Sequence, residues 1–484
     1  MSQEVRNLEP KIVWNHFADL NAVPRPSKKE ERIIQFMVDF GKKLNLETFV
    51  DSVGNVIIKK PATKGFENRK TIVLQGHLDM VHQKNATTNF DFENEGIQMV
   101  VDGDWVKAKG TTLGADNGLG VAAIMAILSS SEIEHPAIEA LFTIDEETGM
   151  TGAMGLQPDV LQGEILLNLD TEEDDEIGIG CAGGVDVTAT KTYQEIETNI
   201  QDIAYKISVT GLQGGHSGMD IHRGFGNANK IMNRLLYSIL EVIEIVSING
   251  GSLRNAIPRE SFVTFVIDKN DKNSVKNSLK NEIENIKKEF ASIESNLKIE
   301  FSETETPSAK MSNEGSKQLI KSIYATHNGV YRMSPDVAGL VETSNNIATV
   351  KVVNGNIEIG CLTRSSSESG KIDLANTITS GFELAGFSVK LSGDYPGWLP
   401  NLDSSILQVL ETSYVKLFNQ QPHIAACHAG LECGIIGQHY PKMEMISFGP
   451  NIKGAHSPDE KAQISSTQKF WKLIKDVLAS IPEI

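Results

Sequence analysis

The sequence predicts an α/β fold: a catalytic domain with a mostly parallel mixed sheet flanked by helices, interrupted by an inserted α+β lid domain. Three observations support this class. Apolar strands alternate with helices near both ends of the chain, which is typical of a largely parallel sheet covered on both faces. The order changes over residues 186–394, where pairs of strands alternate with helices. The chain of 484 residues also exceeds one ordinary core, so two domains are expected.

The catalytic domain is predicted to be split between residues 1–185 and residues 395–484. Hydrophobic periodicity identifies its helices and short strands. In the first part these are a helix over 30–44, strands over 55–59 and 71–75, a helix over 118–130, and strands over 138–144 and 165–169. In the second part they are a helix over 404–418, a strand over 443–447 and a helix over 466–480.

The lid domain, residues 186–394, is predicted to form two βαββαβ-like units, of which the second is incomplete. The first unit has a strand over 204–209, a helix over 227–240, strands over 244–248 and 261–267, a helix over 272–290 and a strand over 297–301. The second has a helix over 316–326, strands over 347–353 and 356–361, a helix over 372–385 and a strand over 388–391. Tyr395-Pro396-Gly397 is predicted to be the hinge back to the catalytic domain.

Composition excludes several classes of protein. With 40% hydrophobic and 22% charged residues, the chain has the make-up of a globular protein. A net charge of −18 disfavours binding to nucleic acid or to an anionic membrane surface, and leaves small molecules or peptides as partners. We expect no secretory signal and no membrane span, since the longest apolar run is residues 121–128. The four cysteines form no CxxC pair, which together with these features predicts a cytoplasmic location.

Four polar clusters follow apolar strands at the point where each strand ends. His77 and Asp79 follow the strand over 71–75, and the acidic run Asp145-Glu146-Glu147 follows the strand over 138–144. Asp170 follows the strand over 165–169, and His456 lies in the loop after the strand over 443–447. Because the carboxyl ends of parallel strands converge on one crevice, these side chains are expected to lie close together. Two histidines with several carboxylates are the ligand set that zinc prefers.

Asp116 is the fifth candidate ligand, in the glycine-rich turn LGADNGLG that opens a helix. By itself this aspartate fits a helix N-cap or an Asx turn better than a carboxylate that bridges two metals. A phosphate-binding loop is a poor alternative because the GxxxxGK and GxGxxG spacings are both missing. Each of the other four clusters also fits an ordinary structural or solvated role when taken alone. It is their joint occurrence at strand ends that favours a metal site.

The motifs GHLDMV, GADNG, DEETG, NLDTEE and GAHSPDE, in this order, resemble those of the co-catalytic zinc exopeptidases. That family includes carnosinases, aminoacylases and glutamate carboxypeptidases. The resemblance covers essentially the whole chain, and the segments GGHSG and HAGLECG are most similar to the bacterial aminoacyl-histidine dipeptidase branch. It implies a dinuclear centre for two divalent metal ions, expected to be Zn²⁺ with Co²⁺ or Mn²⁺ able to substitute.

The resemblance also implies a role for each residue of the centre. Asp116 would bridge the two ions. One ion would be completed by His77 and Asp170, and the other by Glu147 and His456. In addition, Asp79 would hold the second imidazole nitrogen of His77, and Glu146 would be the general base. An aspartate at position 170 resembles the aminopeptidase and dipeptidase members, which favours cleavage next to a free N-terminus.

The lid is expected to contribute substrate contacts. His216 in GGHSG matches the histidine that the family places against the oxyanion. Asn255 and Arg364 resemble the groups that clamp the C-terminal carboxylate of the substrate, a task that suits the planar fork of arginine. Glu432 in HAGLECG is predicted to line the pocket. The plain alternatives are a glycine-rich turn for His216 and ordinary surface polarity for Asn255 and Arg364.

Taken together, these features predict a metal-dependent dipeptidase for dipeptides with free amino and carboxyl termini, Xaa-His dipeptides such as carnosine included. One alternative is an N-acyl amino-acid deacylase or a tripeptide aminopeptidase on the same scaffold. An alternative of another class is an inactive peptide-binding protein. The resemblance leaves the oligomeric state open between a homodimer and a monomer with an enlarged lid.

Overall fold

The computed structural model describes residues 3–484 and divides into two compact units. The first unit comprises the chain up to Gly180 together with Pro400–Ala426 and Glu432–Ile484, and the second comprises Cys181–Leu399 and Cys427–Leu431. The boundaries that we predicted from the sequence, at residues 185 and 394, fall close to these limits. The assignment of the units as a catalytic domain and a lid domain stays a prediction.

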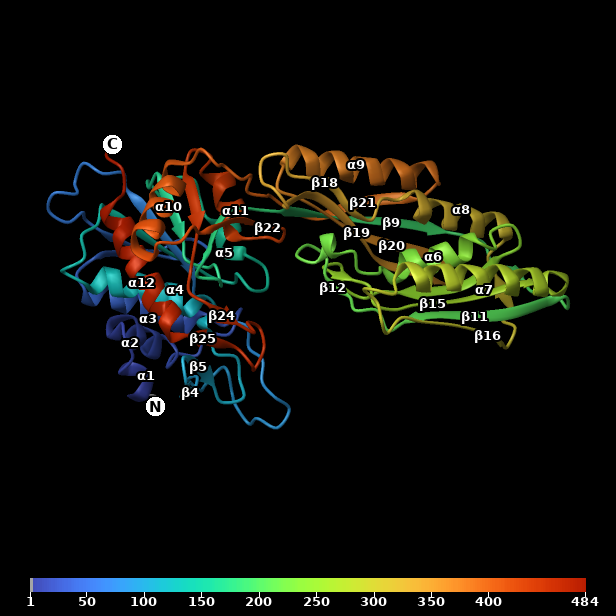
Figure 1. Cartoon of the computed structure of the whole chain (residues 1–484), viewed down its shortest axis with the longest axis horizontal. Helices are drawn as coiled ribbons and strands as arrows, with labels where there is room; N and C mark the ends of the chain where they lie inside the picture. Colours follow the sequence, from blue (N-terminus) through green and yellow to red (C-terminus); the bar gives the residue numbers. More distant parts are fainter. Residues whose placement is uncertain (1–2) are drawn as a thin grey trace. The chain divides into compact units, whose positions relative to one another are not determined.

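The first unit, which Figure 1 draws in blue for the early part of the chain and in red for its end, is built on a mixed sheet whose strand order is β1-β2-β6-β3-β7-β23-β8-β22. The neighbouring strands β6, β3, β7 and β23 are parallel, whereas β1, β2 and β8 pair in the antiparallel sense. Every residue of β3 and of β6 is buried, so helices and loops cover both faces. The predicted α/β class is therefore confirmed. The bounds are β1 (Glu47–Val50), β2 (Val56–Lys60), β3 (Ile72–His77), β6 (Ile138–Thr143), β7 (Ile165–Asn168), β8 (Glu176–Cys181), β22 (His423–Cys427) and β23 (Glu444–Ser447).

Helix α4 (Ala115–Ser129) is the central helix of the first unit. It packs against β3 and α2 and is buried continuously from Asn117 to Leu128, as expected for a helix that is apolar on every side. Within residues 3–484, no helix is long and apolar enough to cross a membrane. The other helices are α1 (Gln3–Arg6), α2 (Lys11–Leu20), α3 (Glu31–Lys43), α5 (Thr151–Gly155), α10 (Ser405–Phe418), α11 (Glu432–His439) and α12 (Ile464–Ala479).

A small second sheet in the first unit joins the end of the chain to an early segment. Its order is β24-β25-β5-β4, and β25 pairs with β5 in the antiparallel sense. The strands are β4 (Met99–Asp102), β5 (Trp105–Ala108), β24 (Ile452–Lys453) and β25 (Lys461–Gln463). Because β24 and β25 flank the loop that contains His456, this sheet fixes both ends of that loop.

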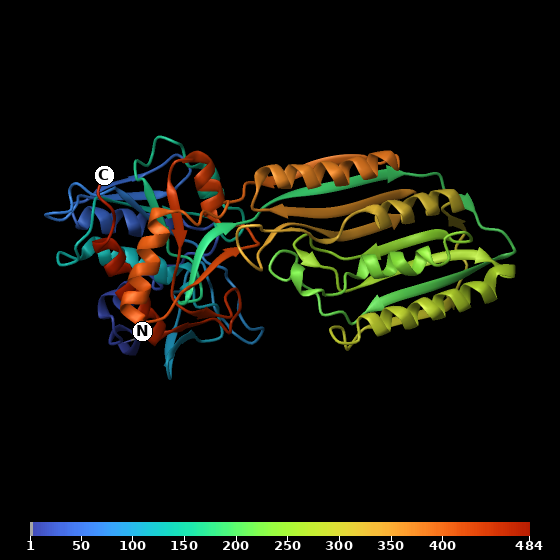
Figure 2. The same ribbon diagram turned by 45° about the horizontal axis from the view of Figure 1, so that its top comes forward.

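The second unit contains an antiparallel sheet of the order β16-β11-β15-β13-β19-β20-β9-β21, with β18 paired to β19. Helices α9, α8, α6 and α7 lie side by side on one face of it (Figure 2). The strands are β9 (Gly183–Thr192), β11 (Asp202–Thr210), β13 (Glu244–Gly250), β15 (Ser261–Asp268), β16 (Lys298–Thr304), β18 (Gly329–Met333), β19 (Val341–Val353), β20 (Asn356–Ser365) and β21 (Ser388–Tyr395). The helices are α6 (Ala228–Tyr237), α7 (Lys272–Glu289), α8 (Asn313–Ala325) and α9 (Glu368–Leu384).

This sheet consists of two halves with the same internal order. The first is β16-β11-β15-β13, and the second, read from the opposite edge, is β21-β9-β20-β19. Each half is a βαββαβ unit, since β9 supplies the first strand of the second half although it precedes the whole first half in sequence. Our description of the second unit as incomplete was therefore wrong, because the missing strand lies more than a hundred residues upstream of its partners.

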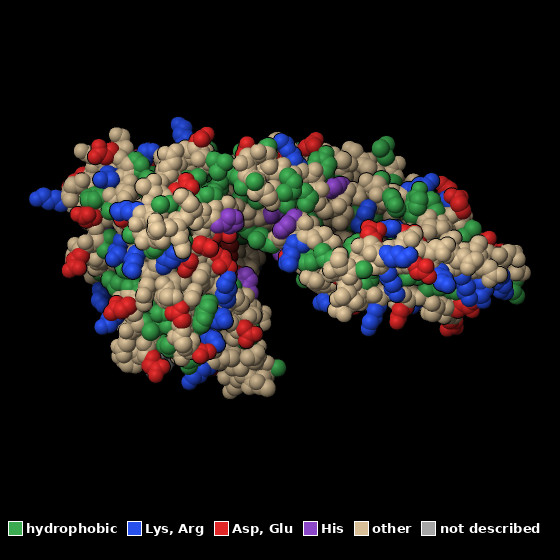
Figure 3. Space-filling model, in the orientation of Figure 1, with side chains coloured by type: hydrophobic (Ala, Val, Ile, Leu, Met, Phe, Trp, Pro, Cys, Tyr) green, Lys and Arg blue, Asp and Glu red, His purple; other side chains and the backbone are tan. Residues whose placement is uncertain are grey.

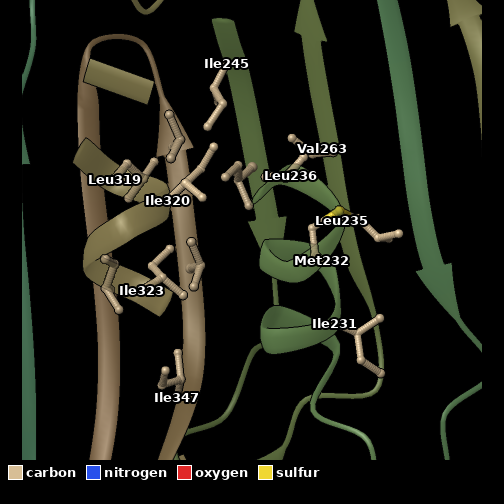
Figure 4. Packing of buried hydrophobic residues seen from close by; sticks show 14 of the residues in the cluster. Ile231, Met232, Leu235, Leu236, Ile245, Val263, Leu319, Ile320, Ile323 and Ile347 are labelled. Carbon is tan, nitrogen blue, oxygen red and sulfur yellow. The ribbon is translucent and has the colours of Figure 1, made fainter. Parts of the chain in front are cut away.

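The core of the second unit lies between the helices and the sheet. Side chains of α6 and α8 interdigitate over β13, β15 and β19 (Figure 4). The labelled residues are Ile231, Met232, Leu235, Leu236, Ile245, Val263, Leu319, Ile320, Ile323 and Ile347. At the surface, acidic and basic side chains are interspersed over the face of each unit that Figure 3 shows.

Candidate metal centre

The predicted metal ligands of the first unit lie at the carboxyl ends of its parallel strands. His77 is the last residue of β3, Asp170 follows β7 by two residues, and Glu147 lies in the turn after β6. His456 belongs to the loop between β24 and β25, after β23. Because β6, β3, β7 and β23 are parallel neighbours, these ends meet at the same edge of the sheet.

Asp116 lies at the centre of the cluster, and its two carboxylate oxygens face different groups. His77 Nε2 is 3.2 Å from Asp116 Oδ1 and 3.6 Å from Asp170 Oδ1. His456 Nε2 is 3.2 Å from Asp116 Oδ2 and 3.0 Å from Glu147 Oε2. The residues thus form two trios that share Asp116, and in each trio the ligand atoms lie within 4.8 Å of one another. This is the arrangement that a carboxylate bridging two ions requires.

The local backbone explains why the Asp116 side chain is available. Asp116 belongs to the first turn of α4, yet its φ of −80° and ψ of 112° are not helical. The preceding Gly114 has a φ of 68°, and the peptide bond between Asp116 and Asn117 is cis. The side chain of Asp116 contacts His77 and His456 instead of capping the helix.

The carboxylates of the cluster stabilise the protonated forms of the two histidines. Burial opposes a charge on His77, but Asp170 and Asp116 raise its pKa well above the ordinary value. Hydrogen bonds to Asp116 and Glu147 raise the pKa of His456 to about 11. Burial alone would favour neutral Asp116, yet the same two histidines hold its pKa below the ordinary value. The histidines and carboxylates of the cluster thus hold each other in their charged forms, and the carboxylates of Asp116, Glu147 and Asp170 outnumber the two imidazoles.

Two buried oxygens of the described cluster form no hydrogen bond, and one of them, Asp170 Oδ1, has only the 3.6 Å ion-pair contact with His77. Within residues 3–484, Glu147 Oε1 and Asp170 Oδ1 are buried and form no hydrogen bond. A buried polar atom without a partner costs about 1–3 kcal/mol. Coordination of divalent ions by these oxygens and by the imidazole nitrogens would remove that cost. The donor set of carboxylates and imidazoles fits zinc and similar transition metals.

Asp79 connects His77 with the acidic turn that carries Glu146 and Glu147. Its Oδ1 lies 3.4 Å from His77 Nδ1 and accepts the N–H of Glu146 at 3.0 Å, while Oδ2 accepts the N–H of Glu147 at 3.3 Å. Asp145 organises the same turn by accepting the hydroxyls of Thr148 and Thr151. Asp79 thus lies at ion-pair distance behind the ring of His77 and binds the backbone of the acidic turn, and its role in orienting a metal-bound histidine stays a prediction.

The Glu146 carboxylate is different from that of its neighbour Glu147. Among the residues that the structure describes, its side chain forms no hydrogen bond or ion pair, although it lies within reach of His77 and Glu147. Burial raises the pKa of Glu146 well above the ordinary value, and nearby carboxylates raise it further. A half-buried carboxylate that forms no hydrogen bond or ion pair within residues 3–484 and has a raised pKa is a candidate for proton transfer.

Glu432, predicted to line the substrate pocket, is buried in the first turn of α11 with 2% of its surface exposed. Its Oε2 accepts hydrogen bonds from Gln75 Nε2 and Thr143 Oγ1, both at 2.7 Å. Gln75 in turn accepts a bond from Asn168 Nδ2 at 2.5 Å. The carboxylate thus belongs to a polar network between β6, β3 and β7, and its contact with a substrate stays a prediction.

His216 lies in the second unit on the short strand β12 (Gly215–His216), which pairs with β14 (Ala256–Ile257). Its Nδ1 accepts the backbone N–H groups of Gly218 at 3.2 Å and Met219 at 3.0 Å. Burial, followed by the charge of Arg364, lowers the pKa of His216, so the ring is neutral. A neutral ring whose Nδ1 accepts must carry its proton on Nε2, and this proton is available for donation.

Arg364 is a buried cation of the second unit without an acidic partner. It is 4% exposed, and it donates from Nη1 to Tyr395 Oη at 2.7 Å and from Nε to Ser217 Oγ at 3.4 Å. Within residues 3–484, no carboxylate lies at ion-pair distance from its guanidinium. Burying a charge without a counter-ion is costly, so this position favours binding of an anion. Arg364 and His216 are neighbours through Ser217.

Asn255, a predicted substrate contact, and the nearby histidine His428 have different surroundings in the second unit. Asn255 is exposed, and its carbonyl accepts the N–H of Ser217 at 2.8 Å. His428 is buried and forms a hydrogen bond through Nε2 with Ser344 Oγ at 2.8 Å. Burial lowers the pKa of His428 to about 3. It is therefore a neutral structural residue, which agrees with the absence of zinc-ligand spacing around it.

Two residues that contact the cluster were missed by the sequence analysis. Glu460 accepts hydrogen bonds from the backbone that carries Asp116, and Arg25 donates to the same segment. Glu460 lies in the GAHSPDE motif, where its position four residues after His456 was the available signal. Nothing around Arg25 in the sequence distinguishes it from a surface arginine.

Comparison with known proteins agrees with this geometry. The model of a family described as Peptidase family M20/M25/M40 matches residues 73–480. The chain is 43% identical over 481 residues to the cytosol non-specific dipeptidase of Escherichia coli, which covers 99% of each protein.

Solved structures show the same relationship. The aminoacylhistidine dipeptidase of Vibrio alginolyticus is similar with a TM-score of 0.94 and 43% identity, covering 100% of this chain and 99% of that one. The aminopeptidase PepT of Bacillus cereus has a TM-score of 0.58 at 16% identity, covering 98% of this chain and 99% of that one. This second similarity concerns the fold alone.

Proposed function

The chain belongs to the peptidase family M20/M25/M40, a family of metal-dependent peptidases, and on this premise we propose that it is a dipeptidase for substrates with free amino and carboxyl termini. The observation that carries the proposal is the pair of trios that share Asp116, each with one histidine and a second carboxylate. The names of the two relatives that match almost the whole chain support the substrate class, including Xaa-His dipeptides such as carnosine.

We assign the ligands of the two ions according to these trios. His77, Asp116 and Asp170 would hold one ion, and Asp116, Glu147 and His456 would hold the other. The ions, expected to be Zn²⁺, supply positive charge that polarises the scissile carbonyl and lowers the pKa of water. The residues of the chain position the substrate and move the proton.

Glu146 is the proposed general base. Because its carboxylate has no protein partner, it is free to accept the proton of the attacking water and to return it to the leaving amine. Its neighbour Glu147 is already engaged with His456, at 3.0 Å, and serves as a ligand. Asp79 keeps His77 oriented through Nδ1.

The second unit is proposed to act as a lid that binds the other polar parts of the substrate. His216 is proposed to donate its Nε2–H to the oxyanion that develops on the carbonyl oxygen, which the two hydrogen bonds accepted by Nδ1 support by leaving the proton on Nε2. Arg364, which lacks an acidic partner, binds the C-terminal carboxylate through its planar fork, with Asn255 as a second donor. We further propose a cytoplasmic location and small peptides as the partners of the enzyme, with a homodimer as one open oligomeric state.

A hydrolysis panel tests this function. The protein reconstituted with Zn²⁺ is given free dipeptides, among them carnosine, together with N-acetylated amino acids, amidated dipeptides and tripeptides. We expect the free dipeptides to be the best substrates, since both termini have a binding group. Faster hydrolysis of acetylated amino acids would indicate a deacylase, faster hydrolysis of tripeptides a tripeptide aminopeptidase, and no turnover with bound peptide an inactive binding protein.

A further inference from the structure

A buried carboxylate binds the turn that carries Asp116. Glu460 is 2% exposed, and its Oε2 accepts the N–H groups of Leu113 at 2.7 Å and Gly114 at 3.0 Å. Its Oε1 accepts the N–H groups of Ala115 at 2.7 Å and Asp116 at 3.3 Å. Ala115 and Asp116 open α4, where the first N–H groups have no partner within the helix, and Leu113 and Gly114 directly precede it. One side chain therefore satisfies four consecutive backbone donors.

A buried cation binds the acceptor side of the same turn. Arg25 is 1% exposed, and its Nη2 donates to the carbonyl of Gly114 at 2.5 Å. Its Nη1 donates to the carbonyls of Leu78 at 3.1 Å and Asp79 at 3.0 Å. Gly114 is thus held between two opposite charges, with its N–H on Glu460 and its C=O on Arg25. A Cβ atom at Gly114 would lie 2.6 Å from Arg25 Nη2, so a side chain at this position would have to displace the guanidinium from its carbonyl partner.

These two residues contact three backbone segments that carry proposed ligands. Arg25 contacts the segment directly after His77, and both residues contact the turn before Asp116. Glu460 lies four residues after His456 in the same loop. The backbone of His456 is in the left-handed region, with a φ of 62°. A displacement of any of these backbone segments would change the distance between the proposed imidazole and carboxylate ligands.

We propose that Arg25 and Glu460 are positioning residues that fix the spacing of His77, Asp116 and His456, and thereby set the affinity for the two metal ions. The inference rests on the proposed function, because it assumes that these three residues bind metal. Neither residue belongs to the shared trios of the metal centre, so their effect is exerted through the backbone.

The chemistry of both side chains is specific. A glutamine at position 460 has one acceptor oxygen, and its NH₂ group would face two backbone N–H donors. An aspartate is one methylene shorter and would not reach all four donors at these distances. At position 25, a lysine retains the charge but lacks the planar fork that reaches carbonyls on two separate segments.

The two residues are expected to affect the two ions unequally. Glu460 supports the backbone of Asp116 and lies in the loop of His456, which both belong to the trio with Glu147. Arg25 supports the backbone after His77, which belongs to the trio with Asp170. Glu460→Gln should therefore weaken the site with Glu147 more strongly. Arg25→Lys should weaken the site with Asp170 more strongly. Loss of a residue that orients ligands commonly costs about 10–100-fold in metal affinity.

The test is a Zn²⁺ titration of the metal-free protein against a competing chelator, which gives both dissociation constants without reference to activity. Stability of the metal-free variants in urea is measured in parallel. Glu139→Gln is the matched control, since Glu139 is also buried in the first unit and accepts the N–H groups of Gln162 at 2.7 Å and Gly163 at 2.9 Å. It lies near the start of β6, at the opposite end of that strand from the centre.

We expect Glu460→Gln to raise one dissociation constant for Zn²⁺ by about 10–100-fold, while Glu139→Gln leaves both unchanged at a comparable loss of stability. Wild-type dissociation constants in Glu460→Gln would overturn the proposal, as would an equal loss of affinity in the control. If Glu460→Gln does not fold, Arg25→Lys decides by the same criteria at the other site. A wild-type protein that binds two ions but cleaves no dipeptide would contradict the proposed function and leave this inference standing.

Discussion

The two units gather buried groups of opposite character. Around Asp116 in the first unit, carboxylates outnumber cationic side chains, and burial raises the pKa of Asp170 to about 6. In the second unit Arg364 is buried without an acidic partner, and it lowers the pKa of His216 in addition to the effect of burial. Each cluster is electrostatically incomplete in the described chain.

This difference indicates what each cluster binds. An excess of buried carboxylates is stabilised by divalent cations, whereas a buried guanidinium is stabilised by an anion such as a carboxylate. In the proposed function the first unit supplies the metal site and the general base, and the second supplies groups for the oxyanion and the C-terminal carboxylate. Substitutions in the first unit should therefore change metal binding or kcat. Substitutions in the second unit should change kcat or KM and leave metal binding unchanged.

The largest effect is expected for Asp116→Ala, because it removes a ligand from both ions. The activity on a free dipeptide should fall by more than about 10⁴-fold. This exceeds the largest loss that is common when a general base is removed. Metal analysis by mass spectrometry should find both ions depleted. A variant that retains two ions and measurable turnover would show that Asp116 is not the bridge.

Glu146→Gln is expected to have the next largest effect. Turnover should fall by about 10²–10⁴-fold while both ions and the fold are retained, since this carboxylate acts on a proton. The adjacent Glu147→Gln should instead weaken metal binding as well as turnover. The comparison would fail if the two variants showed the reverse pattern in metal content and kcat.

His216→Ala should reduce kcat by about 10²–10³-fold with unchanged metal content, because its Nε2–H is expected to stabilise charge that develops only in the transition state. His327 of the same unit, whose Nε2 is 3.2 Å from the carbonyl of Gly329, provides the control. His327→Ala should leave kcat unchanged. A wild-type kcat in His216→Ala would contradict the oxyanion role and leave this histidine as part of a glycine-rich turn.

Arg364→Ala is expected to have the smallest effect on kcat and to raise KM by about 10–100-fold, since a bound carboxylate is held equally in the ground and transition states. The defect should shrink for amidated dipeptides, which lack that carboxylate. Arg234, which is paired with Glu282 and Glu289, is the control, and Arg234→Ala should leave KM unchanged. An equal KM defect on amidated substrates would exclude the clamp.

The class of fold, and the meeting of the candidate ligands at one edge of the sheet, could be predicted because they depend on local patterns. Strands β3, β6 and β7 are short apolar runs that end in polar residues, and parallel strands bring such ends to one edge. The family resemblance then allowed a role to be expected for each residue. Those roles, and the contact of Glu432 with a substrate, stay predictions.

What the sequence analysis missed depends on contacts between distant segments. Strand β9 completes the second half of its sheet through pairing with β20, some 170 residues later, and no local pattern identifies that partner. The positions of Arg25 and Glu460 around Gly114 likewise follow from tertiary packing, as charged residues are seldom buried without such partners. The positioning role of Arg25 and Glu460 can be inferred only once the backbone groups that they bind are known.

Metal stoichiometry measured together with activity tests the central claim most directly. Metal-free protein is titrated with Zn²⁺ while hydrolysis of a free dipeptide is followed, and bound metal is determined at each point. The two trios that share Asp116 predict that activity is absent without metal, rises with added Zn²⁺ and saturates at two ions per chain. Full activity in the metal-free protein, or saturation at a single ion per chain, would contradict the dinuclear dipeptidase.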